Sequence, residues 1–341
     1  MNHPRNLIKP TLAGLLQWMP LENWVKWSGQ NLVFPFYHGI YEKTPAFLEG
    51  LYAVMTPEQF ENHLDALLRH YEPLSPEALV TYLRNGKQRE TTGFFLSFDD
   101  GLRSCYETIA PILLRKGIPA AFYVNTDFVD NKALFYRYKN VLLYHQWTSK
   151  KNKALGSKLA DILECPVKEL KDRLLNLGFF EEEMRNAVAE ALNISFEEFL
   201  HENKPYMNWA ELKELEQKGF VIGSHGCHHQ AYGEMTEQVR RLNTRKSFEI
   251  LQSRLNLSYR SFSFPFTDDR VPYEFFNWLE REMKIDWSFG TAGLKNDPVP
   301  KHLQRIPMEH KRFKTAQQIL REEFSYFMVR GLLRKNTVRR A

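Results

Sequence analysis

The sequence predicts an α/β fold in which parallel strands close into a barrel. Short segments rich in β-branched and aromatic residues alternate with helical segments, which is typical of parallel sheets. Several strand segments are nearly continuous apolar runs, as expected for strands covered on both faces. Polar residues follow the strands at their C-terminal ends, where the active sites of such barrels lie. These polar ends favour a barrel over an open sheet.

The chain of 341 residues, with 25 phenylalanines, can fill one large core. We therefore expect one barrel domain that spans residues 1–341. Seven strands are expected, at residues 32–39, 94–98, 120–125, 220–225, 261–266, 287–291 and 303–308.

Helix-start signals delimit the helices between these strands. Thr56 is a predicted N-cap, Pro57 suits the first helical position, and Gln59 completes a capping box. Ser75 and Asn208 begin similar segments. The helices are expected at residues 56–71, 75–86, 208–219 and 236–255.

Residues 131–207 interrupt the alternation of strands and helices. The segment is charged, helical in pattern and without a strand pattern, so it is predicted to be a helical insertion between two barrel strands. Its aromatic residues either form a wall or lid, or belong to ordinary helix packing. Both interpretations stay open from the sequence.

A basic helix and tail are expected at residues 314–341. The last 13 residues hold five basic and no acidic side chains, which accounts for the net charge of +5. The tail is interpreted either as a solvated segment or as a peripheral contact with an anionic membrane surface. Nucleic acid is not an expected partner, because no basic-aromatic pattern extends beyond this tail.

The cysteines and the apolar segments suggest a location. There are three cysteines and no CxxC pair, which argues against a disulfide framework and for a reducing compartment. No apolar run approaches the roughly 18 residues of a membrane span. The first 27 residues contain Pro10 and Pro20 and lack a clean cleavage site, so no signal peptide is predicted. A cytoplasmic location is expected, with membrane association through the tail as the alternative.

The segment "FVIGSHGCHHQ" holds three histidines, His225, His228 and His229, directly after a strand. Imidazole is a common zinc ligand, and hydrolytic zinc sites combine three protein ligands with one open position. The four-residue spacing of His225 and His229 and the three-residue spacing of His225 and His228 both suit a pair of ligands. No glutamate lies within the motif to act as a base.

The segment "FFLSFDDG" ends a strand with Asp99 and Asp100 side by side. Adjacent carboxylates repel each other, and a divalent cation bound to one of them relieves the repulsion. The other carboxylate can then take a proton from a water that the cation acidifies. Alternatively, the two aspartates only cap the following helix, and the histidines only end a strand or lie in a loop.

These segments resemble a known family. "LSFDDGLRSCYETIAPILLRKGIPAAFYVN", "MNWAELKELEQKGFVIGSHGCHH" and "SFSFPF" are similar in order and spacing to polysaccharide deacetylases of the NodB-homology type, carbohydrate esterase family 4. The first motif of that family, [ST]FDDG, matches residues 97–101, and the second, H[ST]xxH, matches both histidines of residues 225–229. The resemblance covers residues 90–130 and 205–310, and it implies a distorted (β/α)7 barrel.

The resemblance also implies roles for the matching residues. Asp99 would be the catalytic base. Asp100, His225 and His229 would bind one divalent cation, Zn2+ or another divalent ion. His228 would lie outside the ligand set or behind it, and Cys227 should point away from the metal.

Further roles follow from other segments. "PFYHGIYEK" resembles the YH segment of the subgroup that includes the poly-N-acetylglucosamine deacetylases, so His38 would be the general acid. In "SFPF" the N–H of Phe266 would stabilise an oxyanion. Arg305 lies where the family often has an arginine that orients the catalytic aspartate. A core or loop histidine remains the structural interpretation of His38.

The chain departs from the family pattern at three places. The arginine of the third motif is absent, with Phe262 or Ser263 at its place. Thr267 stands where glycine commonly follows the aromatic residue, and Gly226 replaces the serine or threonine of the second motif. None of these changes removes an expected metal ligand, so they bear on which substrate the protein accepts more than on the reaction that it catalyses.

The resemblance implies a metal-dependent hydrolase that removes N-acetyl groups from an amino-sugar-containing saccharide. Three alternatives stay open: the same hydrolysis on another amide, such as a lipid-linked formamido sugar; a silent carbohydrate-binding barrel; and a structural or interaction protein. The sequence does not indicate the sugar, the metal or the oligomeric state.

Overall fold

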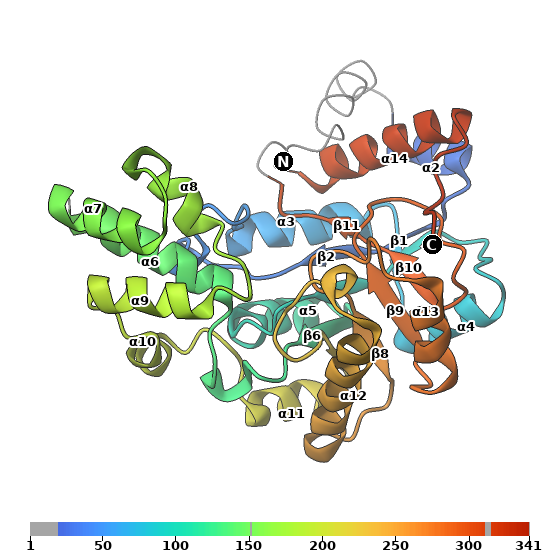
Figure 1. Ribbon diagram of the computed structural model, residues 1–341. Helices are drawn as coiled ribbons and strands as arrows, with labels where there is room; N and C mark the ends of the chain where they lie inside the picture. The colour runs from blue at the N-terminus through green and yellow to red at the C-terminus, as the bar shows by residue number, and fades with distance from the viewer. Residues whose placement is uncertain (1–19, 151, 311–314, 341) are drawn as a thin grey trace.

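The centre of the molecule is an eight-stranded sheet with the strand order β10-β9-β8-β7-β6-β5-β2-β11, in which each neighbouring pair is parallel (Figure 1). The structure is a computed structural model and describes residues 20–150, 152–310 and 315–340. The strands of this sheet are β2 (Pro35–Tyr37), β5 (Leu96–Phe98), β6 (Ala120–Val124), β7 (Val221–Ser224), β8 (Ser261–Ser263), β9 (Trp287–Gly290), β10 (His302–Gln304) and β11 (Ile306–Pro307).

The two outer strands of this sheet close it into a barrel. In the chain, β10 and β11 are separated by Arg305 alone. The N–H of Arg305 donates to the carbonyl of Gly290 on β9, and the N–H of Ile306 donates to the carbonyl of Phe34 beside β2. Since β10 and β11 are two halves of one closing strand, the barrel has the seven strands that the sequence predicts. The distorted (β/α)7 barrel is confirmed.

The helices around the barrel begin where the sequence places their caps. Thr56 and Gln59 form a capping box at the start of α3 (Pro57–Leu68), and Ser75 caps α4 (Pro76–Arg84). A second capping box, on Asn208, starts α11 (Trp209–Gln217). Thr236 caps α12 (Glu237–Arg254). The remaining helices against the barrel are α2 (Leu21–Ser28), α5 (Ala110–Lys116), α13 (Tyr273–Arg281) and α14 (Ala316–Leu332). A separate three-stranded sheet consists of β1 (Leu32–Val33), β3 (Glu72–Pro73) and β4 (Gly93–Phe94).

The segment between β6 and β7 is a group of helices on one side of the barrel, drawn in green in Figure 1. These are α6 (Tyr136–Lys150), α7 (Lys153–Ile162), α8 (Leu170–Leu175), α9 (Glu182–Leu192) and α10 (Phe196–Asn203). They pack around an apolar cluster of their own, which consists of Leu143, Leu159, Leu163, Leu170, Leu174, Leu177, Val188, Ala189 and Leu192. The first residues of this segment reach the strand ends, because the Tyr138 hydroxyl donates to Asp100, which lies just after the end of β5.

The C-terminal tail contacts the barrel. Helix α14 lies beside α2 in Figure 1. Beyond α14, Thr337 forms a β-bridge with Asn296, and the side chain of Arg340, only 5% exposed, pairs with Asp268 and Asp297. A wholly solvated tail is therefore wrong for Arg340, because two acidic residues distant in the sequence bind it.

No helix in the described part of the chain is both long and apolar enough to cross a bilayer. The expected absence of a signal peptide concerns the first residues of the chain, and residues 1–19 lie outside the described part.

Candidate active site

Six of the seven residues singled out in the sequence line one pocket of about 200 Å³. The pocket lies at the C-terminal ends of the strands, because β2, β5, β7 and β8 end just before the residues concerned. These residues are His38, Asp99, Asp100, His225, His229 and Phe266. The seventh residue, Arg305, is completely buried and lies next to Asp99 inside the barrel.

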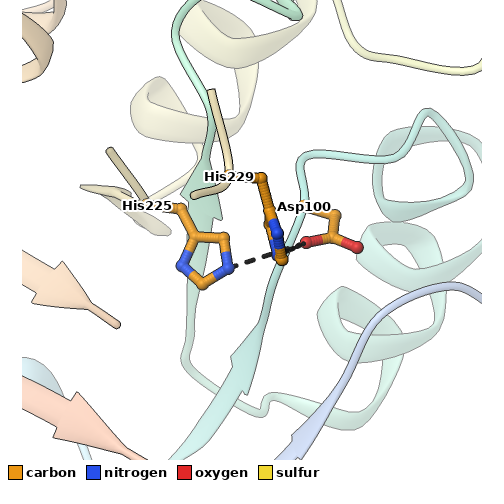
Figure 2. A group of neighbouring side chains, drawn as sticks. All are labelled: Asp100, His225 and His229. Carbon is orange, nitrogen blue, oxygen red and sulfur yellow. Dashed lines mark ion pairs between the residues drawn. The ribbon is translucent and has the colours of Figure 1, made fainter. Parts of the chain in front are cut away.

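Asp100, His225 and His229 converge on one point, as Figure 2 shows. The Oδ1 atom of Asp100 lies 3.0 Å from Nε2 of His229 and 3.6 Å from Nε2 of His225. The Nδ1 of His225 lies 2.8 Å from the carbonyl oxygen of Ser263. Because a carbonyl oxygen only accepts, Nδ1 carries the proton and Nε2 presents a lone pair to the cluster.

This arrangement fits a divalent cation. Each of the three residues offers one ligand atom, and these atoms lie within 4.8 Å of one another. Burial lowers the pKa of His225 to about 4, so its imidazole is neutral at physiological pH. Among the described residues Oδ1 of Asp100 has no hydrogen-bond donor, although it is buried. Two imidazoles and one carboxylate form a donor set that suits Zn2+ and other first-row divalent ions.

The insertion contributes to this cluster through Tyr138 on α6. The Tyr138 hydroxyl donates to Oδ2 of Asp100 over 3.0 Å, which leaves Oδ1 facing the two histidines. The ring of Phe135 lies 4.4 Å from the ring of His229. The start of the insertion therefore forms one wall of the pocket, as one of the two interpretations of its aromatic residues expects. No feature of the sequence indicated that Tyr138 contacts Asp100.

Asp99 is held by a bidentate ion pair inside the barrel. Nη1 and Nη2 of Arg305 lie 2.8 and 2.6 Å from the two carboxylate oxygens of Asp99. Burial alone would raise the pKa of Asp99, but the Arg305 guanidinium holds it below its ordinary value. Arg305 also donates to the hydroxyls of Ser97 and Ser263. The structure thus places an ionised carboxylate beside the candidate metal ligands, in a fixed orientation.

Phe262 and Ser263 are the two candidates for the place of the third-motif arginine, and the Ser263 hydroxyl donates to Oδ2 of Asp99 over 3.2 Å. In this chain the guanidinium of Arg305, from the closing strand, donates to the Ser263 hydroxyl over 2.6 Å. The positive charge next to Asp99 therefore comes from Arg305 on the closing strand and not from β8.

His38 is oriented by Glu309, a residue that the sequence analysis missed. One Glu309 oxygen accepts hydrogen bonds from the backbone N–H groups of His38 and Gly39, and the other pairs with Nδ1 of the His38 ring. The ring stacks on Tyr52 with centroids 4.6 Å apart. Burial lowers the pKa of His38, but the charge and hydrogen bond of Glu309, together with the charges of Asp100 and Asp99, raise it to about 9. His38 is thus a protonated donor at neutral pH.

Glu309→Gln should move the alkaline limb of the pH–activity profile to lower pH. A general acid works only while protonated, so activity falls as the pH rises through its pKa. Without the Glu309 charge, burial brings the pKa of His38 down from about 9. We expect a loss of about ten-fold or more in kcat at pH 8, since each pH unit above the pKa lowers the protonated fraction about ten-fold.

The control for this prediction is Glu107→Gln, which removes an exposed glutamate that pairs with Arg103. It should leave the profile where it is. An unchanged alkaline limb in Glu309→Gln would contradict the role of the His38–Glu309 pair.

Three pocket residues have left-handed backbone conformations. The φ angles are 72° for Asp100, 54° for His229 and 58° for Phe266. Such angles are costly for residues other than glycine and cluster at functional sites. The N–H of Phe266 has no acceptor among the described residues, so it is available to an oxygen atom in the pocket.

Cys227 and His228 lie apart from the three candidate metal ligands. The thiol of Cys227 contacts the carbonyl oxygen of Asn243 on α12, and burial raises its pKa to about 11. The ring of His228 is 39% exposed and pairs with Asp127. The i,i+4 pair of histidines is therefore the one that faces Asp100.

Comparisons with known proteins give a family match and a shared fold. The sequence model of the family described as polysaccharide deacetylase matches residues 184–272, which contain both histidines of the cluster. The structure of the deacetylase PplD from Streptococcus pyogenes, in complex with acetate, superposes with a TM-score of 0.53 at 14% identity, over 86% of this chain and 97% of that one. The resemblance to the polysaccharide deacetylases is confirmed.

Two further structures share the polysaccharide deacetylase fold. IcaB from Ammonifex degensii has a TM-score of 0.51 at 15% identity, over 86% of this chain and 97% of its own. The polysaccharide deacetylase BC0361 from Bacillus cereus has a TM-score of 0.51 at 15% identity, over 86% of this chain and 69% of its own. At these identities the likeness establishes the fold. No curated protein sequence matches this one significantly.

Proposed function

We propose that this protein is a metal-dependent hydrolase that removes N-acetyl groups from an amino-sugar-containing saccharide. The observation that carries the proposal is the buried Oδ1 of Asp100, which faces the Nε2 atoms of two histidines and has no donor among the described residues. The match to the polysaccharide deacetylase family supports the same reaction.

Asp100, His225 and His229 would hold the metal, and Asp99 would act as the base. A divalent cation supplies Lewis acidity there, which acidifies a water and polarises the carbonyl of the amide. The Asp99 carboxylate accepts the proton of the attacking water. Its ion pair with Arg305 keeps it ionised and fixes its direction.

Phe266 and His38 would serve the later part of the reaction. The Phe266 N–H donates to the oxygen on which negative charge develops. His38, protonated because nearby carboxylates, chiefly Glu309, raise its pKa to about 9, donates a proton to the departing amine. The products are acetate and a free amino sugar.

Metal analysis and product detection test the proposal. The purified protein should contain about one divalent ion per chain and release acetate from N,N′-diacetylchitobiose or longer N-acetylated oligosaccharides. A chelator should stop the release, and added metal should restore it.

Each other result points to one of the alternatives. Bound metal with formate release from an N-formyl sugar, and no acetate, would favour the other-amide hydrolase. Bound metal with neither product would favour a silent carbohydrate-binding barrel. Absence of metal binding would overturn the hydrolase and favour an interaction protein.

A further inference from the structure

A second hollow, of about 660 Å³, adjoins the candidate active site. The two share Phe266 and Thr291 as lining residues. The Thr291 hydroxyl donates to the carbonyl of Phe266 over 2.9 Å, which fixes the boundary between them. A saccharide with one acetamido group at the metal ligands therefore has room to place a neighbouring substituent in the second hollow.

Cations dominate the lining of this hollow. They come from the C-terminal tail, the end of α14 and the segment after β9, and they are Lys295, Arg330, Lys335, Arg339 and Arg340. The carboxylates in the described lining are Asp268 and Asp269. We call this space the cationic hollow.

Asp268 does not offset the exposed cations, because it is already paired. Its carboxylate contacts Arg340 and His302 and accepts a hydrogen bond from Gln304. Asp268, Asp297 and His302 lie close enough together to suggest a metal site, but Arg340 pairs with both aspartates. Lys335 and Arg339 remain exposed at the rim.

A further cation lies on the active-site side of Phe266. The guanidinium of Arg137, at the start of α6, lies 4.5 Å from the centroid of the Phe266 ring. Arg137 is exposed, and no carboxylate among the described residues pairs with it. Phe266 is thus flanked by Arg137 on the side of the metal ligands and by the cationic hollow on the other.

We propose that the cationic hollow, together with Arg137, binds a negatively charged group of the saccharide substrate, either a phosphoryl group or a carboxylate. Arginine and lysine are the side chains that recognise such groups, and arginine does so with two parallel hydrogen bonds. The inference rests on the proposed function, since it names the class of saccharide that the site accepts. The substrate is an N-acetylated saccharide that carries an anionic substituent next to the sugar unit whose acetamido group reacts.

Matched neutral and charged substrates test this proposal. The substrates are N,N′-diacetylchitobiose, its 1-phosphate, and a disaccharide of N-acetylglucosamine and glucuronic acid. The wild-type protein should prefer one of the charged substrates by about ten-fold in kcat/KM at low salt, mainly through KM, because a few exposed ion contacts together amount to about that factor. The preference should fall as salt is added. Comparison of kcat/KM for the 1-phosphate and for the disaccharide with glucuronic acid shows whether the subsite binds a phosphoryl group or a carboxylate.

The variant for this test is Lys335→Ala with Arg339→Ala, and the control is Lys213→Ala. Lys213 is an exposed lysine on α11, away from the tail (Figure 1). The double variant should lose most of the preference for the charged substrate, and the control should keep it. Equal kcat/KM values for neutral and charged substrates in the wild type, or an unchanged preference in the double variant, would overturn the proposal.

A binding measurement tests the anion subsite independently of the deacetylation reaction. The Kd of N-acetylglucosamine 1-phosphate is measured by calorimetry on metal-free protein, so that the phosphate cannot bind to the metal. A weaker Kd in the double variant than in the wild type and in Lys213→Ala would support the subsite even if no substrate released acetate. Equal Kd values would overturn it even in an active deacetylase.

Discussion

Asp99→Asn should bind metal and lose between about 100-fold and about 10,000-fold of its turnover, the range that a general base contributes. The asparagine amide has nearly the same shape as the carboxylate and cannot accept the proton of the attacking water. The substitution leaves the candidate metal ligands Asp100, His225 and His229 unchanged. The loss should appear in kcat, measured as acetate release at saturating substrate, while the metal content stays at the wild-type level.

The same substitution leaves Arg305 buried beside a neutral group. Loss of one partner from a buried ion pair costs about 3–5 kcal/mol, so the midpoint of thermal unfolding should fall. Metal content and a cooperative unfolding transition show that the inactive variant is folded.

Asp127→Asn is the matched control for this prediction. Its carboxylate pairs with His228, and Asp127 does not line the pocket. It should retain activity. Turnover near the wild-type level in Asp99→Asn would contradict the assignment of Asp99 as the base.

Much of the fold follows from the sequence because local signals and the global architecture agree. Apolar runs mark the barrel strands, and Thr56, Ser75 and Asn208 cap helices where they are expected. The eighth named strand arises only because the closing strand is divided at Arg305. Pairing at this point depends on β9 and β2, which are distant in the chain, so no local pattern reveals the division.

The sequence identifies a pocket residue where a polar side chain lies at the end of a predicted strand or directly after it. Asp99 directly follows the segment 94–98, His225 is the last residue of the segment 220–225, and His38 is the last residue but one of the segment 32–39. Glu309 carries the same signal, since it directly follows the segment 303–308. Tyr138 has no such signal, because it lies on an insertion helix whose position depends on tertiary packing.

The departure at Gly226 also has a local reason that only the structure reveals. Gly226 has a φ of +75°, which favours glycine. A Cβ atom there would lie 2.8 Å from Oδ1 of Asn243 and 3.0 Å from the Tyr232 hydroxyl. A serine or threonine at this position would therefore be strained by its backbone angle and would displace the side chain of Asn243 on α12.

His225→Ala should lose both the metal and the activity. The His225 ring is buried, and its Nδ1 is hydrogen-bonded to Ser263, so its Nε2 is directed at the cluster. Substitution of a residue that only hydrogen-bonds to a metal ligand weakens metal binding by about 10-fold to 100-fold. Removal of a ligand itself should therefore weaken metal binding by at least about 100-fold. Competition with a chromophoric chelator measures this loss, and acetate release should fall to background.

The same motif provides the matched control. His228→Ala removes an identical ring three residues away, and that ring is 39% exposed and pairs with Asp127. It should keep metal affinity and turnover close to the wild-type values. The contrast between the two variants depends only on which imidazole faces Asp100. If His225→Ala retained its metal while His228→Ala lost it, the cation would lie on the other face of the motif, and neither Asp99 nor the N–H of Phe266 would be placed to act on an amide held there.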